Sequence, residues 1–348
     1  MERLNPTQTN GAEKLLEIKN LKTYFQLDEG LVKAVDGVTF DIYRGETLGI
    51  VGESGCGKSM TARSILQIVD PPGKVVEGSI LYHLVDGTQV RTVDITKLKP
   101  DSNQMRSIRG AEIAMIFQEP MTSLSPVYTI GNQIIEALNL HRKMSKAEAR
   151  AEAIDLLRRV GIANPERLVD EYPHQLSGGM RQRAMIAIAL SCRPRLLLAD
   201  EPTTALDVTT QAQILELMLD LKKDMGMGIV MITHDLGVVA EMAQRVVVMY
   251  LGRAVEVADT RLLFHDPKHP YTQGLMQSVP KLGRRSSERL KPISGMVPNP
   301  YRRPKGCLFH PRCPRFMPGK CDVIAPPLIT LPGGHQVACH LYEGMGTV

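Results

Sequence analysis

The sequence predicts an α/β protein with an antiparallel β region near its start, a helical region in its middle and a small cysteine-containing extension at its end. An all-apolar run at 48–51 leads through a glycine-rich loop into a helix that begins near Lys58. Two further apolar runs, at 196–199 and 229–232, each end in polar side chains. Short apolar runs of this kind are typical of strands buried on both faces of a parallel sheet.

Periodicity predicts the remaining elements in order. Apolar and polar residues alternate at 15–25 and 32–42, which indicates half-buried antiparallel strands. Apolar residues recur at helical spacing between 119 and 190. A helix at 211–223 joins the two later strands, and 246–250 is a last strand.

A change in composition marks the best domain boundary. From about residue 266, prolines, glycines and cysteines become dense, and helical periodicity fades. We therefore expect one domain over 1–265, with its helical part at about 119–190, and an extension over 266–348.

The composition is that of a folded protein of about two domains. Hydrophobic residues make up 43% and charged residues 23% of the 348, which excludes a disordered or fibrous chain. The formal net charge of +5 is too small to indicate nucleic-acid binding. Polar residues follow Met1, and no apolar run approaches the roughly 20 residues that cross a bilayer. We expect neither a signal peptide nor a membrane span, so any membrane role would come through a partner.

A phosphate-binding pattern, G-x-x-x-x-G-K-[ST], occupies residues 52–59 between the predicted strand and helix. Its glycines let backbone N–H groups converge on phosphates, and the helix N-terminus adds a positive dipole. Lys58 would neutralise the β- and γ-phosphates, and the Ser59 hydroxyl would bind Mg²⁺. The complete match in its proper context disfavours a chance glycine turn. The nucleotide-binding residues predicted here are Gly52, Ser54, Gly55, Cys56, Gly57, Lys58, Ser59 and Met60.

Cys56 lies inside this loop. We interpret it as a small tolerated side chain rather than a nucleophile, because no neighbouring histidine offers a base.

Acidic and imidazole side chains follow the two later strands. Asp200 and Glu201 come at a strand's carboxyl end, where ligands bind in open α/β sheets. Asp200 would hold Mg²⁺, while Glu201 would polarise the attacking water. His234 would contact the γ-phosphate and orient that water. An isolated Asp-Glu pair is more often a cap, and an isolated histidine is more often structural. The phosphate loop favours the catalytic interpretation, with Glu201, His234 and Lys58 as catalytic residues.

Further motifs resemble those of ABC ATPases. The segment LSGGMRQR at 176–183 is similar to the ABC signature, and Gln118 is similar to the Q-loop glutamine. Residues 204–207 resemble the D-loop, and 233–235 resemble the switch-histidine segment. Phe25 is similar to the aromatic residue that stacks on adenine, with Tyr24 as the alternative.

This resemblance implies a P-loop ABC-type ATPase whose two ATPase chains pair head to tail. The signature and D-loop residues would then contact ATP bound to the partner; they are Ser177, Gly178, Gly179 and Asp207. Gln118 would join Ser59 and Asp200 around Mg²⁺.

A closer resemblance is to the ATP-binding subunits of dipeptide/oligopeptide importers, in their D-type form. The segments that carry it are 52–55, IFQEPMTSLSP at 116–126, YPHQL at 172–176, HPYT at 269–272, GC at 306–307 and HPRCP at 310–314. It implies an ATPase at the cytoplasmic face of the membrane that energises peptide uptake. The partners implied are two integral-membrane permease subunits, a paralogous or identical ATPase subunit and an extracytoplasmic solute-binding protein, without nucleic acid. An oligosaccharide or metal complex as solute, a soluble ABC protein and a nucleotide sensor without hydrolysis are the alternatives.

Four of the six cysteines lie near the end of the sequence, spaced C-x5-C-x7-C-x17-C; they are Cys307, Cys313, Cys321 and Cys339. Four thiolates suit Zn²⁺ or an iron–sulfur cluster, and unliganded thiols are the third interpretation. The sequence has no C-x2-C pair here, which disfavours a zinc-ribbon interpretation. Similar tails in peptide-importer ATPases hold a [4Fe–4S] cluster, so the resemblance implies one here.

Overall fold

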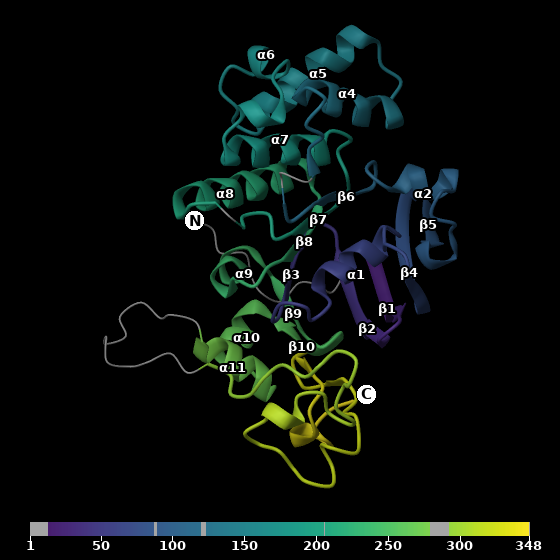
Figure 1. Cartoon of the computed structure of the whole chain (residues 1–348), viewed down its shortest axis with the longest axis vertical. Helices are drawn as coiled ribbons and strands as arrows, with labels where there is room; N and C mark the ends of the chain where they lie inside the picture. Colours follow the sequence, from purple (N-terminus) through teal and green to yellow (C-terminus); the bar gives the residue numbers. More distant parts are fainter. Residues whose placement is uncertain (1–12, 87–88, 120–122, 205, 279–291, 348) are drawn as a thin grey trace. The chain divides into compact units, whose positions relative to one another are not determined.

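The computed structural model describes residues 13–86, 89–119, 123–204, 206–278 and 292–347 (Figure 1). The chain divides into two compact units. Unit 1 contains Met1–Asp41, Thr47–Thr96 and Ile232–Val348, and unit 2 contains Ile42–Glu46 and Lys97–Met231.

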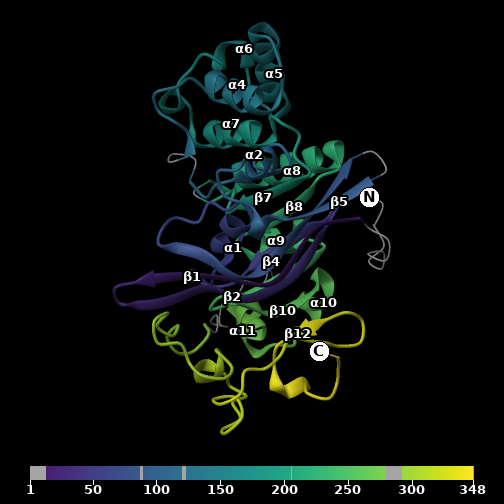
Figure 2. The same ribbon diagram turned by 90° about the vertical axis from the view of Figure 1, so that its right-hand side faces the viewer.

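An antiparallel sheet forms the first part of unit 1, with its strands in the order β2-β1-β4-β5 (Figure 2). The strands are β1 (Lys14–Leu27), β2 (Gly30–Tyr43), β4 (Gly73–Asp86) and β5 (Gln89–Asp94). The first two confirm the alternation read from the sequence, whereas β4 and β5 were not predicted. Phe25 lies opposite Gly73, where an added Cβ would come within 2.4 Å of the phenyl ring. Glycine therefore leaves room for that ring.

Parallel strands form the second part of unit 1. The predicted buried strand β3 (Thr47–Val51) pairs in parallel with β9 (Arg245–Tyr250), and β10 (Arg253–Asp259) continues antiparallel to β9. All five residues of β3 are buried, as the all-apolar run predicts. Helix α1 (Lys58–Ile65) follows β3 across the glycine loop, and α9 (Leu236–Met242) packs its Val239 against Gly49.

The C-terminal extension adds strands to this sheet. Beyond β10, the chain forms α10 (Thr260–His265) and α11 (Pro270–Ser278), and then two short strands, β11 (Ile329–Thr330) and β12 (Gln336–Val337). β12 pairs antiparallel with β10, and β11 pairs with β12. Both sides of the predicted boundary at 265/266 belong to unit 1, and the boundary itself stays a prediction.

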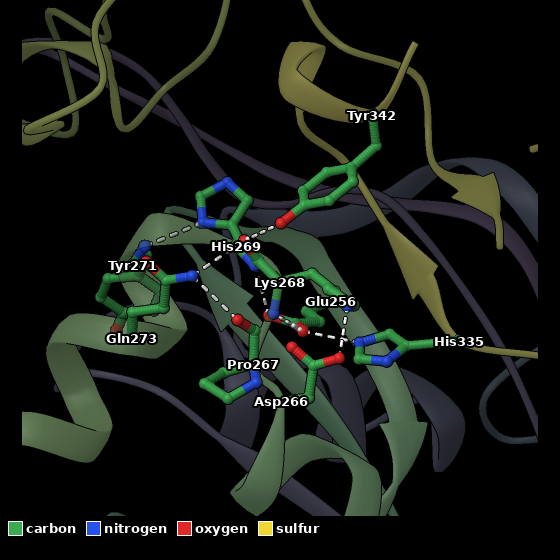
Figure 3. A network of polar contacts seen from close by, with 9 residues as sticks. All are labelled: Glu256, Asp266, Pro267, Lys268, His269, Tyr271, Gln273, His335 and Tyr342. Carbon is green, nitrogen blue, oxygen red and sulfur yellow. Dashed lines mark hydrogen bonds and ion pairs between the residues drawn. The ribbon is translucent and has the colours of Figure 1, made fainter. Parts of the chain in front are cut away.

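A buried polar network also fixes the extension (Figure 3). Glu256 on β10 is fully buried and accepts hydrogen bonds from the backbone N–H groups of Lys268 (2.6 Å) and His269 (2.9 Å). The Nε2 atom of His335, just before β12, lies 2.6 Å from the same carboxylate. Burial lowers the pKa of His269 to about 4, with Glu256 opposing the shift. His269 is therefore neutral near pH 7, and its Nδ1 accepts the Tyr271 N–H.

Among the described residues of unit 2, the strands lie in the order β8-β7-β6, with β6 and β7 parallel. They are β6 (Ile113–Ile116), β7 (Leu196–Asp200) and β8 (Gly228–Ile232), whose last residue is assigned to unit 1. Its helices are α2 (Asn103–Ile108), α4 (Ile130–His141), α5 (Lys146–Arg159), α6 (Pro165–Leu168), α7 (Gly178–Leu190) and α8 (Val208–Met225). Short 3₁₀ helices in the chain lie at Ile95–Lys97, Pro173–Gln175, His310–Arg312 and His340–Tyr342.

The helices of unit 2 begin where the sequence supplies caps. Ser145 and Glu148 form a reciprocal capping box at the start of α5. Helix α8 ends at Gly226, whose φ of 61° lies in the left-handed region that favours glycine. Helices α4 to α7 occupy the region predicted to be helical (Figure 1). Within the described residues, no helix has the length and apolar character needed to span a bilayer.

Candidate nucleotide-binding site

Two glycines of the phosphate loop have positive φ angles and lie so close to neighbouring backbone that a side chain would not fit. Gly52 and Gly57 have φ values of 152° and 101°. A Cβ added at Gly52 would lie 2.2 Å from the Met249 carbonyl oxygen, and one at Gly57 would lie 2.2 Å from that of Ala34. These glycines therefore let the loop backbone pass directly against its neighbours.

The Lys58 side chain binds back to the backbone of its own loop. Its side chain is buried, and Nζ donates to the carbonyl oxygens of Gly52 (2.8 Å) and Glu53 (3.2 Å). Ser59 and Met60 follow in the first turn of α1, while Ser54 and Gly55 are exposed. The loop thus presents an exposed backbone tip next to a buried cation and a helix N-terminus, which is a suitable arrangement for phosphate.

The surroundings of Cys56 fit a structural role. The residue is buried, and burial raises the pKa of its thiol, so the protonated form predominates at neutral pH. A protonated thiol is a poor nucleophile.

The segment containing His234 runs beside the strand that leads into this loop. The Thr233 N–H donates to the Ile50 carbonyl oxygen of β3 at 3.3 Å. His234 itself is exposed, and Asp235 caps α9 by accepting the N–H of Gly237 at 2.8 Å. Unit 1 therefore brings the histidine segment to the same end of β3 as the phosphate loop.

The aromatic alternatives differ in their contacts. The Tyr24 hydroxyl donates to the buried Asp36 carboxylate at 2.6 Å, whereas the half-buried Phe25 lies across Gly73. This engagement of Tyr24 favours Phe25 as the adenine-stacking residue.

The two acids differ in burial and in backbone conformation. Asp200 ends β7 and is buried, while Glu201 has a φ of 47°, which is unusual for a residue other than glycine. One Glu201 oxygen, Oε2, accepts hydrogen bonds from the Gln118 amide (3.1 Å) and the Thr204 hydroxyl (2.9 Å). Strained backbone held by side-chain hydrogen bonds is common at functional sites. The sequence did not single out the Thr204 contact, although its place three residues after Glu201 was available as a signal.

The signature and the D-loop lie close together in unit 2. Ser177 and Gly178 are exposed at the start of α7, where Ser177 is the N-cap. Asp207 is the exposed N-cap of α8, and its hydrogen bonds from Thr210 lower the pKa of its carboxyl. A Cβ added at Gly179 would lie 3.0 Å from the Thr210 side chain. Both segments are thus presented at helix N-termini. Ala205 of the D-loop and residues 120–122 of the Q-loop segment lie outside the described residues.

The tail cysteines do not form a recognisable metal site. None of the four forms a disulfide. The Cys307 N–H donates to the Cys321 carbonyl oxygen at 2.8 Å. Burial raises the pKa of Cys339 to about 11, and the other three tail thiols add to this increase. The part of the chain that the structure describes nevertheless contains no group of three or more His, Cys, Asp or Glu placed to hold a metal ion. The geometry therefore does not support the predicted [4Fe–4S] cluster or zinc.

The donors predicted for Mg²⁺ have suitable chemistry. Ser59, Gln118 and Asp200 offer hydroxyl, amide and carboxylate oxygens, which are the hard ligands that Mg²⁺ prefers. Mg²⁺ usually takes its other ligands from substrate phosphates and water, so few protein ligands suffice.

The phosphate loop, the acid-terminated strand and the capped signature helix define the class of ATP-binding cassette proteins. A family model described as "ABC transporter" matches residues 35–204, and one described as "Oligopeptide/dipeptide transporter, C-terminal region" matches residues 255–321. The solved structure "Dimeric structure of a post-hydrolysis state of the ATP-binding cassette MJ0796 bound to ADP and Pi" is 29% identical, with a TM-score of 0.61. That match covers 71% of this chain and 99% of the other.

Curated relatives match nearly the whole chain. "Oligopeptide transport ATP-binding protein AppD" of Bacillus subtilis is 53% identical over 95% of this chain and 98% of its own. "Dipeptide transport ATP-binding protein DppD" of Escherichia coli is 46% identical over 94% of this chain and 96% of its own. The chain therefore belongs to the family of ATP-binding proteins of oligopeptide and dipeptide ABC transporters.

Proposed function

We propose that this protein is the ATP-hydrolysing subunit of an ABC importer that takes up peptides. The observation that carries the proposal is the joint presence of a full set of cassette motifs and the peptide-transporter C-terminal region in one chain. Relatives named for oligopeptide and dipeptide transport match both parts.

In this proposal, the chain's own residues bind and orient ATP. Lys58 and the loop N–H groups bind the phosphates, and Phe25 stacks on adenine. Ser59, Gln118 and Asp200 would hold Mg²⁺, which supplies charge neutralisation at the β- and γ-phosphates. Glu201 accepts a proton from the attacking water, and His234 orients that water near the γ-phosphate.

The second half of each site would come from a partner ATPase. Ser177, Gly178, Gly179 and Asp207 would contact nucleotide bound to the other chain. The exposure of Ser177, Gly178 and Asp207 at helix N-termini supports this role. Closure of the pair on ATP and its opening after hydrolysis would shift the membrane subunits between two states.

The proposed assembly contains two permease subunits and a paralogous or identical ATPase, at the cytoplasmic face of the membrane. A solute-binding protein would deliver the solute from outside. The names of the relatives support peptides over an oligosaccharide or a metal complex. They also favour a transport subunit over a soluble ABC protein or a nucleotide sensor without hydrolysis.

The proposal is tested by co-expressing this chain with its permeases and partner ATPase and reconstituting the complex in vesicles. We expect the complex to purify intact, and we expect the dipeptide-loaded binding protein to stimulate both ATP hydrolysis and dipeptide uptake. Binding protein loaded with an oligosaccharide is the control. Stimulation by that control alone would reassign the solute, and a chain that does not associate with the permeases would contradict the transport role.

The [4Fe–4S] cluster remains a prediction supported only by the family resemblance. Iron and sulfide analysis after anaerobic purification is the measurement that decides it. Colourless, iron-free protein would remove the cluster, and bound zinc would select the alternative metal.

A further inference from the structure

A side chain of the C-terminal extension binds directly to the phosphate loop. The Arg312 guanidinium donates Nη1 to Oε2 of Glu53 at 2.7 Å and Nη2 to Oε1 at 3.0 Å. Glu53 is the second residue of the loop, 259 positions away in sequence. The Arg312 side chain is only 4% exposed, so this two-bond pair is shielded from solvent on the arginine side.

A second contact holds the same loop residue through its backbone. The Glu53 N–H donates to the hydroxyl of Tyr271, on α11, at 2.9 Å. Tyr271 packs against Tyr250 and Phe309, with ring centroids 4.7 and 5.4 Å away. The Arg312 guanidinium lies 5.9 Å from the ring centroids of both Tyr250 and Phe309. A rigid aromatic base therefore supports both groups that reach Glu53.

Glu53 is in turn connected to the phosphate-binding groups. Its carbonyl oxygen accepts hydrogen bonds from Lys58 Nζ at 3.2 Å and from the Cys56 N–H at 3.3 Å. Movement of Glu53 would therefore displace both the lysine and the turn that carries the loop N–H groups.

We propose that Arg312, together with Tyr271, is a positioning residue for the phosphate loop and thereby sets the affinity of the protein for ATP. The inference rests on the proposed function in taking ATP as the ligand. It assigns the extension a role at the nucleotide site, in addition to its attachment to β10. The competing view is that Arg312 only fastens the extension to the rest of unit 1.

The two views differ in what the loss of Arg312 does to nucleotide binding. We expect Arg312→Ala in the full chain to raise the Kd for MgATP by about tenfold, because the loop loses a charge-assisted pair that orders it. The Kd of Arg312→Lys for MgATP should lie between that of the unmodified chain and that of Arg312→Ala, because lysine keeps the charge but cannot form the bidentate pair. Tyr271→Phe removes only the hydroxyl and should raise the Kd by about threefold.

A double-mutant cycle tests the pair itself. Glu53→Gln should raise the Kd, and combining it with Arg312→Ala should add little, since both changes remove the same interaction. If Arg312→Ala does not fold, Tyr271→Phe and Glu53→Gln still decide the proposal, because both substitutions conserve shape.

Two control variants separate positioning from attachment. Arg302→Ala removes an exposed arginine of the extension and should change neither stability nor affinity. His335→Ala removes the partner of Glu256 and should lower the melting temperature while leaving the Kd for MgATP within about twofold of the original. An equal rise in Kd for His335→Ala and Arg312→Ala would overturn the proposal, because general loosening of the extension would then explain both.

The same titrations keep this inference distinct from the proposed function. The unmodified chain should bind MgATP, and Lys58→Ala should lose this binding. If Arg312→Ala and Tyr271→Phe then bind MgATP with unaltered affinity, the positioning role alone is refuted. A failure of the unmodified chain to bind MgATP would contradict the proposed function itself.

Discussion

Replacing Glu201 by glutamine is expected to lower the ATPase kcat of the assembled complex by about 10³-fold and to leave ATP binding unchanged. Glutamine keeps the size of the side chain and can still accept the hydrogen bonds that Gln118 and Thr204 now donate. It cannot take a proton from the attacking water. The loss should therefore fall on the chemical step and not on the Kd for MgATP.

The measurement is a steady-state ATPase assay of the reconstituted complex, paired with nucleotide binding to the same preparation. Glu216→Gln, at an exposed position of α8, is the matched control and should behave like the unmodified protein. Undiminished hydrolysis by the Glu201→Gln complex would contradict the assignment of Glu201 as the base. A large loss of ATP binding would show instead that the carboxylate mainly shapes the site.

Replacing Lys58 by alanine is expected to raise the Kd for MgATP by about 100-fold, because the site loses its buried cation for the β- and γ-phosphates. The change also removes the two hydrogen bonds from Nζ to the Gly52 and Glu53 carbonyl oxygens, so the loop loses an internal contact as well. Both effects act in the same direction.

Titration of the full chain with a fluorescent ATP analogue, with unlabelled MgATP as competitor, measures this change. The exposed Lys99→Ala is the charge-matched control and should not alter the affinity. Lys58→Arg should bind MgATP little better than Lys58→Ala, because a guanidinium differs in shape from the compact ammonium. Unchanged affinity in Lys58→Ala would place the nucleotide outside the phosphate loop and refute the predicted site.

Several parts of this protein follow from local sequence alone. The apolar run of β3, the glycines at 52 and 57 and the caps of α5 and α8 are set by neighbouring residues, and the structure has each as its local pattern indicates. The same holds for the phosphate loop, since its backbone geometry depends on glycine at fixed positions.

Other features depend on the path of the whole chain. Strands β4 and β5 were not predicted, although they complete the antiparallel sheet with β1 and β2. The cysteine spacing indicated a possible ligand set, but whether thiols converge on a metal depends on how a loop-rich segment folds. The contacts of Glu201 with Gln118 likewise join residues 83 positions apart.

The amino-acid sequence by itself determined the fold class and the glycine positions of the phosphate loop, because each depends on a short pattern with a local physical cause. It indicated the other cassette motifs through their resemblance to ABC ATPases. Only the tertiary structure decided that Arg312 and Tyr271 of the extension hold Glu53. No local pattern specifies such a pair, because an ion pair between residues 259 positions apart forms only when the fold of the whole chain brings both groups together.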